Sequence, residues 1–115
     1  MFIKPELKLL NMDVRREMLE TRARLYEHGK KEETVAAYKD ILVRAEAAHA
    51  PADDITICLT SLGMVSHELN QLDDAIAFYS RALQQPLHDG LRAQVLQNQA
   101  TAYMAAHKYD EAVRV

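Results

Sequence analysis

Five histidines and one cysteine are the side chains of this 115-residue sequence that most readily suggest chemistry. Three of the histidines, at positions 28, 67 and 107, are spaced at nearly equal intervals along the sequence, which could suggest a shared metal-binding role. No two histidines stand four residues apart, as a helical zinc site requires, and no group of cysteines accompanies them. We therefore expect surface histidines, with no bound metal and no cofactor.

The single cysteine, Cys58, lies within the apolar stretch "ITICLTSL". A buried, unreactive thiol is therefore expected rather than a nucleophile. One cysteine cannot form an internal disulfide and suits a reducing compartment, so a cytoplasmic location is expected. Glycine-rich phosphate loops and Gly-x-Ser-x-Gly motifs are absent, and the paired acids at 32–33, 53–54 and 73–74 are typical of helix starts. The sequence does not predict an enzyme.

Charge and hydropathy argue against two classes of partner. The net charge is −3 and basic residues form no large cluster, whereas binding to nucleic acid needs a concentrated cationic face. No apolar run approaches the roughly 20 residues of a membrane span. The N-terminal "MFIKPELKLLNMD" lacks the apolar core of a signal peptide. We expect neither nucleic acid nor membrane as a partner.

The composition indicates an all-helical protein. Glycine and proline number only three each, and the chain is rich in helix-forming residues. A pattern also recurs three times along the chain: a polar turn, an acidic first turn, a small residue, and then an aromatic or apolar residue. It is seen in "GKKEETVAAYKDIL" (29–42), "NQLDDAIAFYSRAL" (70–83) and "HKYDEAVRV" (107–115), and a helical pattern precedes each copy.

This pattern resembles the tetratricopeptide repeat (TPR), a 34-residue pair of helices. The middle copy matches the motif at seven positions: Leu59, Leu62, Gly63, Leu72, Ala75, Tyr79 and Ala82. The last copy matches in part, and the first is the weakest, with Arg22 at a small-residue position and Thr34 in place of alanine. The resemblance implies one domain (1–115) containing a right-handed superhelical stack of about five or six helices, with repeats at about 13–50, 53–87 and 90–115.

The repeats predict specific turns and contacts. Gly29, Asn70 and His107 occupy equivalent turn positions, where we expect a left-handed residue to end each first helix. Small residues at Gly63 and Ala75 are expected to face each other, as are Ala100 and Ala112, so that paired helices pack closely. Leu96, Ala100 and Tyr103 share one helical stripe. Asp53 or Asp54 is a plausible N-cap after Pro51.

The spacing between repeats is longer than the family's 34 residues. Successive small positions lie at Thr34, Ala75 and Ala112, and the first interval exceeds 34 by about two helical turns. A long second helix in the first repeat explains the excess. The stripe that begins at Ile3 and Leu7 favours an extended opening helix as well. The alternative is a separate short helix over residues 5–10, with Asn11 or Asp13 capping the next.

The C-terminal copy has only seven residues of its second helix, so we expect Ala112, Val113 and Val115 to form an open hydrophobic end. Three interpretations remain open: a longer parent protein, burial against a second copy of the chain, or a cover supplied by another protein.

The resemblance also implies where a partner binds. In this family the first helix of each repeat lines a concave groove. The candidate lining here consists mainly of uncharged polar side chains. The candidate groove residues are Tyr26, Thr60, Met64, His67, Gln94, Gln97, Asn98 and Thr101. Amide side chains such as Asn98 can donate and accept hydrogen bonds with an extended peptide backbone. The equal alternative is that they are simply solvated polar residues on the surface. We expect a non-catalytic protein- or peptide-binding scaffold; the alternatives are a self-assembling structural segment or the sensor portion of a larger bacterial-type regulator.

Overall fold

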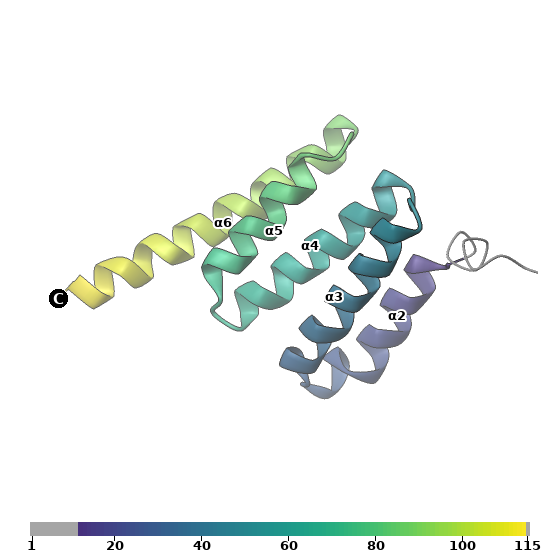
Figure 1. Ribbon diagram of the computed structural model, residues 1–115. Coiled ribbons are helices and arrows are strands. Elements are labelled where there is room, and N and C mark those ends of the chain that lie inside the picture. The colour runs from purple at the N-terminus through teal and green to yellow at the C-terminus, as the bar shows by residue number, and fades with distance from the viewer. Residues whose placement is uncertain (1–11, 115) are drawn as a thin grey trace, which may run out of the picture. The chain divides into compact units, whose positions relative to one another are not determined.

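The computed structural model describes residues 12–114, and every regular element in that range is helical. The elements, shown in Figure 1, are α2 (Val14–Arg24), the short 3-10 helix η1 (Tyr26–His28), α3 (Lys31–Ala47), α4 (Ala52–Glu68), α5 (Leu72–Leu83) and α6 (Asp89–Arg114). Within residues 12–114 there are thus five α-helices and no strand, which confirms the all-α prediction.

The chain divides into two compact units whose boundary falls inside α4. Residues 1–58 form the first unit and residues 59–115 the second. The first half of α4 therefore belongs with α2 and α3, and its second half belongs with α5 and α6. The core of the first unit is built from side chains of α2, α3 and α4, including Val14, Tyr38, Ile41, Leu42, Ala45, Ile55 and Cys58.

Helix α2 begins at Val14 with a side-chain cap. A carboxylate oxygen of Asp13 accepts a hydrogen bond from the backbone N–H of Arg16 at 3.0 Å and so satisfies one of the free N–H groups of the first turn. Residues 12 and 13 are not helical, so the expected continuous opening helix is wrong. Asp13 caps the helix, as the alternative proposed. The expectations for residues 3–11 lie outside the described residues.

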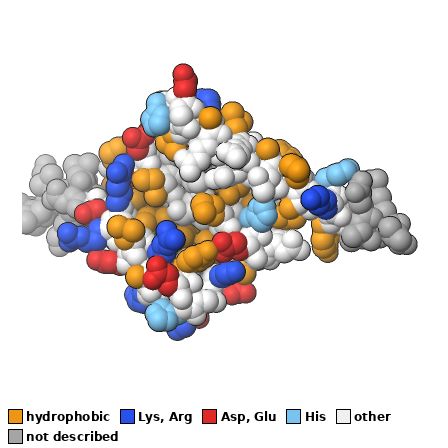
Figure 2. Space-filling view, turned by 180° about the vertical axis from the view of Figure 1, so that it is seen from behind, with side chains coloured by type: hydrophobic (Ala, Val, Ile, Leu, Met, Phe, Trp, Pro, Cys, Tyr) orange, Lys and Arg blue, Asp and Glu red, His pale blue; other side chains and the backbone are white. Residues whose placement is uncertain are grey.

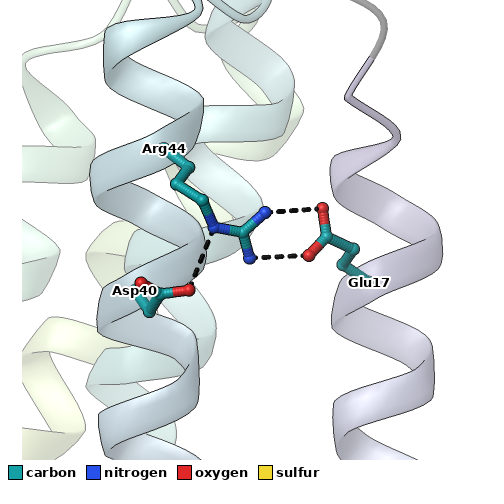
Figure 3. Close-up of polar contacts among 3 residues, drawn as sticks. All are labelled: Glu17, Asp40 and Arg44. Carbon is teal, nitrogen blue, oxygen red and sulfur yellow. Dashed lines mark hydrogen bonds and ion pairs between the residues drawn. The ribbon is translucent and has the colours of Figure 1, made fainter. Parts of the chain in front are cut away.

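Helix α3 is long, as the repeat spacing predicted. It has 17 residues, against 12 in α5. Arg44 ties it to α2, because two guanidinium nitrogens donate to the two carboxylate oxygens of Glu17 at 3.1 and 2.6 Å (Figure 3). The Nε of Arg44 donates to Asp40 on its own helix at 3.0 Å. The forked geometry of this charged contact fixes the register of α2 against α3.

Three helices end in the same left-handed turn. Gly29 (φ 76°) and Asn70 (φ 62°) adopt the predicted conformation, and His49 (φ 53°) after α3 does so unexpectedly. In each turn the next backbone N–H reaches back to a carbonyl five residues earlier: Lys30 to Leu25, Ala50 to Ala45, and Gln71 to Ser66. This pattern satisfies carbonyl groups that the end of a helix leaves free.

The start of α4 differs from the prediction. The helix begins at Ala52, and the backbone N–H groups of residues 54 and 55 donate to the carbonyl of Pro51. Asp53 and Asp54 therefore lie inside the first turn and are not the N-cap. There they favour the positive end of the helix dipole, and Asp54 also accepts a hydrogen bond from Arg15 of α2 at 2.9 Å.

The close approach at Gly63 is confirmed, and the atoms nearest to it belong to the ring of Tyr79. A Cβ placed on Gly63 would lie 2.5 Å from Cε1 of Tyr79, and the three nearest atoms all belong to that ring. Tyr79 is 2% exposed, and Ala75 is fully buried on the same helix. Glycine is needed because the ring of Tyr79 occupies the space that a Cβ would fill.

The predicted turn at His107 is wrong. Helix α6 continues without a break from Asp89 to Arg114, so the expected seven-residue second helix is the end of the first (Figure 1). Alanines 105 and 106 precede His107, and neither glycine nor proline occurs between Leu91 and Arg114, so local propensity favours continuation. The side chains of residues 111–115, including Ala112 and its expected contact with Ala100, lie outside the described residues.

Candidate functional site

Three predicted groove residues share one face of α4. Thr60, Met64 and His67 are spaced by four and three residues, which places them on one side of the helix. Met64 is 50% exposed, whereas Thr60 and His67 are half-buried. The hydroxyl of Thr60 is buried and has no hydrogen-bond partner. This face therefore offers one flexible apolar contact between two polar side chains.

The predicted groove residues of α6 lie close together along two adjacent rows of the helix. Gln94, Gln97 and Thr101 are exposed and Asn98 is half-buried. The hydroxyl of Thr101 donates to the carbonyl of Gln97 at 3.0 Å, so this side chain is already partnered within the helix. The amides present hydrogen-bond donors and acceptors to solvent, and the neighbouring Met104 is 61% exposed. Each of the two faces thus combines an exposed methionine with polar groups.

Tyr26 belongs to the first unit and has a local contact of its own. The guanidinium carbon of Arg22 lies 5.8 Å from the centre of its ring, within the range of a cation–π contact. The ring is half-buried in η1. Arg22, which stands at the position where the repeat pattern has a small residue, is exposed and contacts Tyr26.

The structure gives Cys58 the character of an unreactive thiol. The side chain is fully buried, and burial, with a smaller contribution from Asp54, raises its pKa to about 12. At neutral pH such a group is protonated, and the thiolate is the nucleophilic form. Among residues 12–114, no three histidine, cysteine, aspartate or glutamate side chains gather into a potential metal site.

A surface hollow of about 290 Å³ lies on the first unit, and none of the predicted groove residues lines it. Its lining is polar, formed by Glu17, Glu20, Thr21 and Arg24 of α2. Glu17 already holds Arg44, which leaves few free groups to bind a ligand.

Several exposed apolar side chains were not among the predicted site residues. Hydrophobic groups reach the surface at separate places among charged and polar ones, as Figure 2 shows for one face. The large ones outside the predicted set are Leu19, Val43, Leu96, Tyr103, Met104 and Tyr109. Leu96 and Tyr103 were expected to share one helical stripe with Ala100. Helical spacing grouped them correctly but could not reveal that their face is open.

Comparisons with known proteins add no family to this description. No protein-family model matches the chain, and no curated protein is similar enough to count as a relative. None of the helices in residues 12–114 combines the length and hydropathy needed to cross a membrane. The class that the structure defines is that of an all-helical protein in which successive helices are joined by short turns.

Proposed function

We propose that the chain is a non-catalytic protein-interaction module of the TPR type, in which the helix pairs stack as a right-handed superhelix. Two features support the repeat interpretation. Gly29 and Asn70 end equivalent helices in the same left-handed turn, and the small positions Thr34 and Ala75 are both fully buried. In this arrangement α2, α4 and α6 are the first helices of the repeats and line a concave groove for a peptide or helix of a partner protein.

The observation that carries the proposal is the exposed methionine on the α4 face. Met64 is half exposed although its neighbours Leu62, Gly63, Val65 and Ser66 are all buried. Methionine is flexible and polarisable, so it suits adaptable contacts with apolar side chains of a peptide. His67 beside it can contact the polar backbone of a peptide, and the α6 face repeats the combination of an exposed methionine with polar groups. A cytoplasmic location is part of the same proposal, since the chain's one cysteine is a free thiol.

A peptide-display selection tests the function with a defined probe. Binding of the selected peptides to the native chain is measured by fluorescence anisotropy. The double variant Met64→Glu, Asn98→Ala should lower their affinity at least about tenfold. That loss corresponds to about 1.4 kcal/mol, as expected when one apolar and one polar contact are removed.

The matched control is Val43→Glu on α3, which also replaces an exposed apolar residue, 65% exposed, with an acid. It should leave affinity unchanged, and circular dichroism should show equal helicity for all variants. Selected peptides that bind the double variant as tightly as the native chain would rule out the groove. If no peptide is selected at all, the peptide-binding function itself is wrong.

A further inference from the structure

Helix α6 has an inner face that packs on α5. Val95 and Ala102 are fully buried on this face, and the Nε2 of Gln99 donates to the hydroxyl of Ser80 at 2.8 Å and to the carbonyl of Ile76 at 3.2 Å. Near the start of the helix, Arg92 donates to the carbonyl of Leu83 at 3.3 Å. These contacts account for residues 92, 95, 99 and 102, which recur at helical spacing.

A second face of α6 is apolar at its centre and open. We call it the α6 outer stripe, and it consists of Ala93, Leu96, Ala100, Tyr103 and His107. The intervals are three, four, three and four residues, which is the heptad spacing of a helix that packs along another helix. All five residues are exposed, with Leu96 at 48% and Tyr103 at 54%.

Helix α5 leaves this stripe uncovered because it packs on the inner face of α6, through residues such as Gln99 and Ala102. Helix α6 has 26 residues, about 39 Å, whereas α5 has 12, about 18 Å. Figure 1 shows α6 running beside α5 and then continuing past it. In the middle repeat the equivalent residues Leu59 and Gly63 are fully buried, and Tyr79 of α5 covers Gly63. The outer stripe is therefore a face of the kind that this fold covers with an antiparallel helix.

The stripe is complementary to itself. When two copies of α6 run antiparallel with their heptad positions paired, Ala100 of one lies opposite Tyr103 of the other, and Leu96 lies opposite His107. The small residue then receives an aromatic ring, which is the contact that Gly63 and Tyr79 already make within the second unit. A two-fold axis repeats each of these contacts, as a closed dimer requires.

We propose that a second copy of this chain covers the α6 outer stripe, so that two α6 helices pair antiparallel across a two-fold axis. The uninterrupted path of α6 through His107 is what makes the pairing possible, because a turn there would remove the end of the stripe. This interface lies on a different face of α6 from the predicted groove residues Gln94, Asn98 and Thr101, whereas Gln97 lies at its border, three residues before Ala100.

Sedimentation velocity between about 10 µM and about 1 mM, the range of weak specific complexes, tests the proposal. The native chain should shift from monomer to dimer over this range. Leu96→Glu should raise the dimer dissociation constant at least about tenfold. The matched control Gln94→Glu, with the same charge change on the exposed side of the same helix, should leave it unchanged. Tyr103→Ser is a second stripe variant in case Leu96→Glu alters helicity.

Cross-linking tests the register. Ala100→Cys chains mixed with Tyr103→Cys chains should form a disulfide-linked heterodimer, whereas Ala93→Cys mixed with Ala100→Cys should not, because those positions lie far apart in the proposed pair. The native chain is the background control, since Cys58 is buried. A strict monomer at the highest concentration overturns the proposal, as does a dimer that both stripe variants leave intact or that cross-links in the wrong register.

Discussion

At the scale of the residue, Gly63 shows how one missing Cβ determines the packing of a helix pair. Substitution to alanine places a methyl group 2.5 Å from the buried ring of Tyr79, which cannot swing into solvent. We expect Gly63→Ala to lower the free energy of unfolding by about 1–3 kcal/mol, the usual range for overpacking, in urea titrations followed by circular dichroism.

Gly90→Ala is the matched control, because a Cβ there meets nothing closer than 3.5 Å and the residue lies in the first turn of α6. It should leave stability unchanged or raise it by up to about 1 kcal/mol through helix propensity. Equal stability of the Gly63→Ala variant and the native chain would show that the space beside Gly63 is not tightly packed.

Two buried hydroxyls differ in whether they have a hydrogen-bond partner. The Thr34 hydroxyl donates to the carbonyl of Lys30 at 2.7 Å, whereas the Ser66 hydroxyl is buried without a partner. An unpaired buried polar group is unfavourable, so Ser66→Ala should stabilise the chain by about 1 kcal/mol, and Thr34→Val should destabilise it by about 0.5–1.5 kcal/mol. Thermal unfolding of the two variants checks the signs, and a loss of stability in Ser66→Ala would contradict the account.

At the scale of the element, most of the helices could be predicted because their signals are local. The acidic first turns, the glycine at 29 and the asparagine at 70 define α3 and α5 without reference to the rest of the chain. The long α3 followed from repeat spacing. The position of His49 could not be predicted this way, since a histidine in a left-handed turn carries no distinctive pattern.

The error at His107 has a physical cause. The same turn pattern that breaks the chain at Asn70 is present there in sequence, yet the left-handed turn is stable only when the following helix can fold back and bury its apolar face. Continuing the helix instead adds one backbone hydrogen bond per residue, and the alanines before His107 favour it. The candidate site could likewise be predicted only in part. Helical spacing correctly placed Thr60, Met64 and His67 on one face of α4. On α6, however, it could not distinguish the open face from the face that packs against α5.

Substitution to glycine should have different effects on stability at Asn70 and at His107, the two positions that the repeat pattern makes equivalent. Asn70→Gly should leave stability unchanged or raise it, because φ is +62° there and glycine adopts this conformation without strain. His107→Gly should lower helicity and stability by about 0.5–1 kcal/mol, because the residue lies within α6. NMR Cα shifts of residues 104–110 would report the break directly. If His107→Gly is harmless and those shifts are not helical in the native chain, the turn exists after all.

At the scale of the whole molecule, buried ionisable groups in both units set an alkaline limit to stability. Burial raises the pKa of Cys58 in the first unit from 9.0 to about 12, and burial also raises the pKa of Tyr38 in that unit and of Tyr79 in the second. The folded chain retains these protons at a pH where the unfolded chain releases them. The stability from Cys58 is therefore complete below about pH 9 and is lost as the pH rises towards 12.

We accordingly expect these three groups to leave the urea midpoint of unfolding unchanged near neutral pH. Above about pH 9 the midpoint should fall. Cys58→Ala removes the earliest of the three ionisations, so its decline should begin about one pH unit later, where the tyrosines start to ionise. Parallel curves for the native and Cys58→Ala chains between about pH 9 and 10 would contradict the assignment. Because the thiol is protonated and enclosed, its reaction with a disulfide reagent at pH 8 should also be limited by opening of the fold and should become fast in urea.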